Sequence, residues 1–178
     1  MENQLPRALR AAALLGCALS LHCGSDTGAD PAATAVPVDD DGTTIVADKA
    51  GITAYLQAGT YLKWEGEAAV HDSVRSHGGS VRTYFNNKYL FARRTGSYPM
   101  AVGSMAVKEL YSSGSVSGYA VGVKTRAGTT ADTWTWYETT GLPDVQYFGV
   151  ANPTCEGCHS ADSGRDRSLT PSVPVATR

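Results

Sequence analysis

Two cysteines and a histidine stand close together near the C-terminus, in the segment Cys155-Glu156-Gly157-Cys158-His159. This C-x-x-C-H spacing is the attachment signature of a c-type haem. Two thiols three positions apart lie on one helical turn, so each can bond the same porphyrin. The residue that follows them, His159, then supplies an imidazole as the proximal iron ligand. We therefore predict one covalent haem c, bound by Cys155 and Cys158, with His159 on the iron.

A disulfide or half of a zinc site is the competing interpretation of this segment. A structural zinc site needs four protein ligands, and the only other cysteines are Cys17 and Cys23. Both of these lie in a segment that has the features of an export signal. The haem interpretation is therefore favoured.

Residues 1–23 predict an export signal, because two arginines precede the apolar run 11–21. This run is too short to span a bilayer. Either Cys17 or Cys23 could carry a lipid anchor, as in exported lipoproteins. Plain periplasmic secretion and a Cys17–Cys23 disulfide are the alternatives. Export predicts a periplasmic or otherwise extracytoplasmic protein, in agreement with covalent haem attachment.

Residues 24–42 predict a disordered polar linker, because they are rich in Gly, Ser, Asp, Pro and Ala and lack aromatic residues. The run Asp39-Asp40-Asp41-Gly42 lacks the alternating ligands of a calcium loop and indicates a solvated acidic tether. The length fits one folded domain, over residues 43–178. The net charge of −2 and the lack of a basic patch argue against a nucleic-acid partner.

The middle of this domain predicts an antiparallel sheet. Short segments rich in Val, Tyr, Trp and Thr are separated by clusters of Gly, Ser and Asn. The predicted strands are 81–85, 104–111, 119–125 and 133–138. Helices are expected over 47–58 and 87–94, and the C-x-x-C-H segment opens a final helical turn after Pro153. The expected class is α+β, mainly antiparallel sheet with short flanking helices and a haem-binding turn near the C-terminus.

The late position of the motif bears on the second axial position of the iron. The tail 160–178 holds no Met or His, so a sixth ligand would have to come from upstream. The candidates are Met100, Met105, His71 and His77. Methionines more often fill cores, and both histidines lie in polar segments. We therefore expect a five-coordinate iron with an open side, which favours small-ligand binding over electron transfer alone.

Four segments between residues 64 and 159 stand in a recognisable order. They are His77-Gly78 followed by VRTYFN at 81–86, Tyr98-Pro99 followed by GSMAVKE at 103–109, WTWY at 134–137, and CEGCH at 155–159. Their order and spacing are similar to those of the cytochrome P-460 family, which includes the β-sheet cytochromes c′.

The resemblance implies a small antiparallel sheet with helices packed about it, one covalent haem, and usually a homodimer. Some members bind nitric oxide (NO) and related gases. Others oxidise hydroxylamine and carry a lysine cross-linked to a haem meso carbon, and Lys108 is the position that resembles this lysine. Arg82 matches a strand position near the haem pocket, where it could stabilise an anion or a haem propionate. A surface arginine is the alternative.

Strand alternation places Lys108 and Glu109 on opposite faces that are otherwise apolar. One of the two is expected to point into the domain, where a buried charge needs a partner or a special role. A solvated position of Lys108 at a sheet edge is the alternative. Phe85 and Phe91 are candidates for an apolar pocket, although a phenylalanine more often lies in an ordinary core.

The segment 147–154 just before the motif holds no acid, and the nearest upstream acids are Asp144 and Glu138. Hydroxylamine oxidation is helped by a carboxylate that accepts protons, so this absence favours an apolar, gas-binding pocket. The leading hypothesis is an exported mono-haem cytochrome that binds NO or CO. A hydroxylamine or NO oxidoreductase with a Lys108 cross-link, or a six-coordinate electron-transfer cytochrome with a Met100 or Met105 ligand, are the alternatives. Whether the protein is an enzyme stays open.

Overall fold

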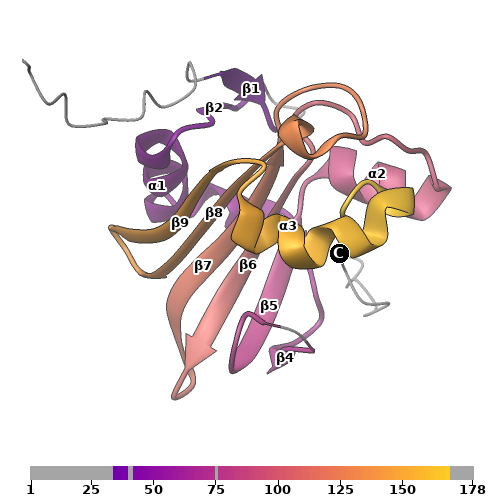
Figure 1. Cartoon of the computed structure of the whole chain (residues 1–178). Coiled ribbons are helices and arrows are strands. Elements are labelled where there is room, and N and C mark those ends of the chain that lie inside the picture. The colour runs from indigo at the N-terminus through magenta and orange to yellow at the C-terminus, as the bar shows by residue number, and fades with distance from the viewer. Residues whose placement is uncertain (1–33, 40–41, 75, 169–178) are drawn as a thin grey trace, which may run out of the picture.

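The computed structural model describes residues 34–39, 42–74 and 76–168 (Figure 1). The predicted export signal, with Cys17 and Cys23, lies outside these residues, and so does most of the predicted linker. Among the described helices, none has both the length and the apolar character needed to cross a bilayer.

A seven-stranded antiparallel sheet forms the centre of the domain, in the order β3-β5-β6-β7-β8-β9 with β4 pairing β5. The strands are β3 (Glu65–Gly66), β4 (His71–Asp72), β5 (Ser80–Phe85), β6 (Met105–Ser112), β7 (Ser115–Lys124), β8 (Trp134–Gly141) and β9 (Asp144–Val150). The predicted α+β class with a mainly antiparallel sheet is confirmed. The four predicted strands correspond to β5, β6, β7 and β8, and β9 extends the sheet beyond them.

A two-stranded ribbon precedes this sheet and corrects the predicted domain boundary. Strand β1 (Ala35–Pro37) pairs antiparallel with β2 (Thr44–Val46), so the fold begins before residue 43. The reason is burial, because Val36 and Val38 lie in the core although they belong to a linker-like stretch of sequence. Asp39 is also not a solvated tether, since it forms an ion pair with Lys63 at 3.2 Å.

Short helices flank the sheet. They are α1 (Lys49–Gln57), η1 (Thr60–Lys63), α2 (Asn87–Thr95), η2 (Ala131–Thr133), α3 (Pro153–His159) and η3 (Ser160–Arg165). The two helices predicted upstream of the motif are confirmed as α1 and α2. Asp48 begins α1 by accepting from the Gly51 N–H at 2.7 Å, and Asn86 begins α2 by accepting from the Tyr89 N–H at 3.0 Å.

The two faces of the sheet differ in what packs against them. Alternation along β6 directs Met105, Val107 and Glu109 into the core that also contains side chains of α1 and η1. The Glu109 carboxylate is buried there and accepts hydrogen bonds from the Tyr61 and Tyr111 hydroxyls at 2.7 and 2.6 Å. The opposite face carries Lys108, and Figure 1 shows α3 in front of the sheet. This second face builds the candidate site.

Candidate functional site

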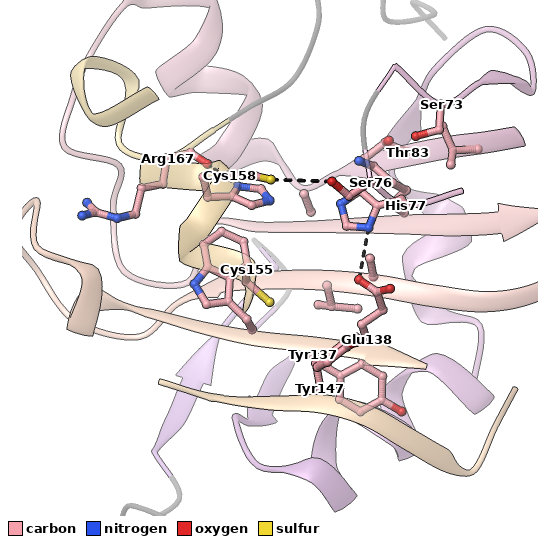
Figure 2. A pocket seen from close by; sticks show the side chains of 18 of the residues that line it. Ser73, Ser76, His77, Thr83, Tyr137, Glu138, Tyr147, Cys155, Cys158 and Arg167 are labelled. Atoms are coloured by element: carbon pink, nitrogen blue, oxygen red, sulfur yellow. Dashed lines mark hydrogen bonds and ion pairs between the residues drawn. The ribbon is translucent and has the colours of Figure 1, made fainter. Parts of the chain in front are cut away.

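A cavity of about 360 Å³ lies over the second face of the sheet. This volume falls within the range of about 300 to 1,000 Å³ that is typical of small-molecule sites. The cavity is lined by Cys155, Cys158 and His159 of α3 and by Lys108 of β6. Figure 2 shows both thiols on one side of the cavity, with Glu138 and His77 opposite Cys155 and Cys158. The structure thus brings together residues that are far apart in the sequence.

Strand register explains why the face is hollow. One row across β5 to β9 consists of Thr83, Lys108, Ala120, Glu138 and Tyr147, and all five line the cavity. The neighbouring row consists of Phe85, Ala106, Gly122 and Trp136, which also line it. The small residues of these rows are Ala106 on β6 and Ala120 and Gly122 on β7, and the aromatic residues Phe85, Trp136 and Tyr147 stand at row ends. The cavity therefore follows from the sequence of β6 and β7.

Helix α3 holds the two cysteines against this cavity. Pro153 occupies its first turn, where the missing N–H is tolerated, and the Asn152 side chain accepts from the Thr154 N–H at 3.1 Å. Both Cys155 and Cys158 are free thiols. Burial, with smaller effects of Glu138 and Glu156, raises the pKa of Cys155 to about 11, so this thiol is protonated at neutral pH. The helical turn predicted after Pro153 is present.

The His159 ring is oriented by the backbone. Its Nδ1–H donates to the Arg167 carbonyl at 2.8 Å, which leaves Nε2 as the nitrogen able to bind a metal. Burial lowers the pKa of His159 from 6.5 to about 4, so the ring is neutral at pH 7. Neutral imidazole is the metal-binding form of histidine. The arrangement therefore prepares His159 to be a ligand.

A buried ion pair fixes the segment that carries this carbonyl. Lys124 and Asp166 meet at 2.7 Å with fully buried side chains. The Asp166 carboxylate also accepts from the Met100 N–H at 2.9 Å and from the Trp134 indole N–H at 3.2 Å. Asp166 and Arg167 both have left-handed backbone angles, with φ of 51° and 64°. These two residues turn the chain so that the Arg167 carbonyl meets the His159 ring.

Trp136 joins α3 to the sheet. Its ring centre lies 4.2 Å from that of His159, and its indole N–H donates to Glu156 at 3.0 Å. The same carboxylate accepts from Arg167 at 2.7 Å, so Glu156 does more than bridge the two cysteines. A Cβ at Gly122 would come within 2.7 Å of the Trp136 ring, which explains why glycine stands opposite this tryptophan.

Lys108 lines the cavity, and its side-chain amine forms no hydrogen bond with any described residue. Burial lowers the pKa of its amine, whereas the carboxylates of Glu67 and Glu138 favour the charged form. The structure thus places Lys108 in one cavity with Cys155, Cys158 and His159. An amine with a lowered pKa is more often neutral, and a neutral amine is a nucleophile.

The absence of acids in segment 147–154 favoured an apolar pocket, but the cavity also holds two carboxylates from elsewhere in the chain. Glu67 and Glu138 both line the cavity. Glu67 accepts from His71 Nε2 at 3.0 Å and from the Thr83 N–H at 2.7 Å, and Glu138 accepts from His77 Nδ1 at 3.1 Å. These carboxylates come from neighbouring strands and loops rather than from the segment before the motif. Only strand register brings them to the site.

Other candidate residues divide between the cavity and elsewhere. Arg82 does not line the cavity and instead donates to the Glu67 carbonyl at 2.9 Å. Phe85 lines the cavity, whereas Phe91 is 63% exposed. Met100 and Met105 are buried in two separate core clusters and do not line the cavity. His71, which lies in β4, and His77, which lies in the loop between β4 and β5, do line it.

Comparison with protein-family models and with curated proteins finds no match to this chain.

Proposed function

We propose that this protein is a c-type haem protein with one covalent haem in the cavity beside α3. Cys155 and Cys158 would form the thioether bonds, and His159 would bind the iron. One observation carries the proposal, namely that two free thiols one turn apart share a cavity with an imidazole whose Nδ1 is already hydrogen-bonded. Metal-bound histidines typically have this second hydrogen bond.

The residues of the cavity fit such a group. Phe85, Trp134 and Trp136 offer flat apolar surface, and small residues leave the space between them. The competing zinc interpretation needs four ligands, and no group of three or more His, Cys, Asp or Glu residues suited to a metal ion occurs in the described part of the chain. A disulfide is also disfavoured, because both thiols are free.

The bound haem would supply redox chemistry and an iron that binds small ligands such as NO, CO or hydroxylamine. The chain's own contribution is a set of groups that accept or donate protons. These are Lys108, the His77–Glu138 pair and the His71–Glu67 pair. Such groups suit a ligand whose binding or reaction moves protons. They favour a site in which a bound ligand reacts over a pocket that only binds a gas.

A hydroxylamine or NO oxidoreductase is the second candidate, and Lys108 is the observation that favours it. Its amine lies in the cavity, with a pKa lowered by burial. The resemblance to the cytochrome P-460 family implies a bond from this lysine to a haem meso carbon. That C–N bond replaces one N–H and one C–H hydrogen, so its formation needs a two-electron oxidant such as peroxide.

An electron-transfer cytochrome with a methionine ligand has less support. Met100 and Met105 are 2% and 0% exposed and pack inside the cores rather than against the cavity. The proposed haem attachment also favours a protein exported to the periplasm, either free or lipid-anchored through Cys17 or Cys23. The resemblance to the cytochrome P-460 family also implies a homodimer.

The test uses the full-length protein produced with a c-type haem maturation system. We expect CO or NO to change the optical spectrum of the reduced holoprotein. Proteolytic haem peptides of the wild type and Lys108→Ala then report the cross-link. A haem peptide that loses the mass of a Lys108-containing segment in the variant supports the oxidoreductase. Identical haem peptides leave the ligand-binding haem protein, and a spectrum that ignores both gases contradicts it.

A further inference from the structure

We propose that His77 is the second axial ligand of the iron in the resting protein and that Glu138 orients it. This inference rests on the haem site proposed above. It replaces the open iron expected from the sequence with a site that is closed until His77 leaves.

The loop between β4 and β5 brings His77 to the cavity. Gly78 and Gly79 follow it with φ of 61° and 42°, a left-handed region that favours glycine. These two residues turn the chain into β5 while the His77 side chain faces the cavity (Figure 2). The preceding Ser76 hydroxyl lies 3.6 Å from the Cys158 sulfur. The loop therefore touches the same helix that carries the proposed attachment cysteines.

Both imidazoles have one ring nitrogen occupied and one available. His77 Nδ1 lies 3.1 Å from a Glu138 carboxylate oxygen, and His159 Nδ1 lies 2.8 Å from the Arg167 carbonyl oxygen. These acceptors assign the proton to Nδ1 in each ring. Neither Nε2 has a hydrogen-bond partner among the described residues. A carboxylate or carbonyl behind the ring is the usual support of a metal-bound histidine.

The distance between the rings distinguishes direct binding from an indirect role. A metal–imidazole bond is about 2 Å long and the ring centre lies about 1.2 Å beyond, so two axial imidazoles have centres about 6.4 Å apart. A histidine that only hydrogen-bonds to an iron-bound ligand would place the centres about 8 to 9 Å apart. The His77 and His159 ring centres are 6.5 Å apart. This separation matches two ligands of one metal.

The other upstream candidates fail on position or on available atoms. His71 lines the cavity, but its Nδ1 contacts the Asp72 carbonyl at 2.9 Å and its Nε2 contacts Glu67 at 3.0 Å. Both of its ring nitrogens are therefore occupied. Met100 and Met105 lie outside the cavity. His77 alone among the four combines a cavity position with an unoccupied nitrogen.

NO or CO can reach the iron only while His77 is dissociated, so the observed association rate is reduced in proportion to the open fraction. Glu138 strengthens the closed form by orienting the ring and by raising the basicity of Nε2. The pair thus sets how readily the site opens.

The test compares holoproteins by optical and electron paramagnetic resonance spectra. Wild type should be low-spin and six-coordinate, and His77→Ala should be high-spin. Added imidazole should restore the low-spin spectrum of His77→Ala, which shows that this variant is folded. His71→Ala is the matched control and should stay low-spin. CO should bind reduced His77→Ala about tenfold faster or more, and Glu138→Gln should lie between the two.

The outcomes separate this inference from the proposed function. Failure to attach covalent haem at Cys155 and Cys158 would contradict the proposed function itself. Covalent haem in a wild type that is already high-spin, or in a His77→Ala variant that stays low-spin, would overturn the role of His77 alone. A low-spin signal lost in His71→Ala rather than in His77→Ala would also overturn it.

Discussion

Replacing Asp166 by asparagine tests whether a buried ion pair holds the segment that orients His159. In the wild type the Lys124 ammonium lies 2.7 Å from the Asp166 carboxylate, and both side chains are fully buried. Asparagine keeps the size of the side chain but removes its charge. Lys124 would retain only neutral partners, the Gly128 carbonyl at 2.6 Å and the Thr133 hydroxyl at 2.9 Å. An uncompensated buried charge would remain.

Removing one partner of a buried ion pair destabilises a protein by about 3 to 5 kcal/mol. We expect the lower part of this range, about 3 to 4 kcal/mol, because the asparagine oxygen can still accept one of the remaining hydrogen bonds. With a urea m-value of about 2 kcal/mol/M, the unfolding midpoint should fall by about 1.5 to 2 M. The m-value itself should not change.

The assay is urea unfolding followed by tryptophan fluorescence, because Trp134 lies beside the pair. The double variant Lys124→Met/Asp166→Asn is the matched control, since it removes the orphan charge as well. It should be more stable than Asp166→Asn by about 1 to 2 kcal/mol. The reasoning is refuted if Asp166→Asn loses less than about 1 kcal/mol, or if the double variant is no more stable than the single one.

Two further substitutions, at Gly122 and His71, change residues that line the cavity. Gly122→Ala should lower stability by about 1 to 3 kcal/mol through overpacking against the Trp136 ring. Gly164→Ala, whose Cβ would meet nothing within 4 Å, should leave thermal unfolding unchanged. Burial disfavours the protonated His71 ring, but the Asp72 carbonyl and Glu67 outweigh it and raise the pKa of His71 above 6.5. The stability difference between wild type and His71→Gln should therefore be full below pH 6.5 and vanish as the pH rises through the raised pKa. A difference that grows with pH would contradict this sign.

The regular part of the fold could be predicted because its signals are local. Alternation and turn residues mark β5 to β8, and capping residues mark α1 and α2. Strand β9 was missed because Gln146 and Gly149 interrupt its apolar pattern and most of it is only half-buried. Strand β1 was missed because Val36 stands among linker-like residues. Only its tertiary packing shows that it belongs to the core.

Some residues of the candidate site could likewise be predicted from the sequence, and others could not. Cys155, Cys158 and His159 form a contiguous signature, so their shared position could be predicted. Glu67 and Glu138 could not, because strand register rather than sequence proximity brings them to Lys108. The Lys124–Asp166 pair joins residues 42 positions apart. The only sequence signal for it is a lysine at the end of an apolar strand.

The proposed haem attachment is tested most directly by the mass of the purified holoprotein. We predict that the denatured wild type retains the mass of one haem, whereas a Cys155→Ala/Cys158→Ala double variant loses it. Each single variant should keep one thioether bond, and Ser76→Ala, which changes only the neighbour of Cys158, should behave as wild type. A wild type without covalent haem, or a double variant that retains it, would contradict the account.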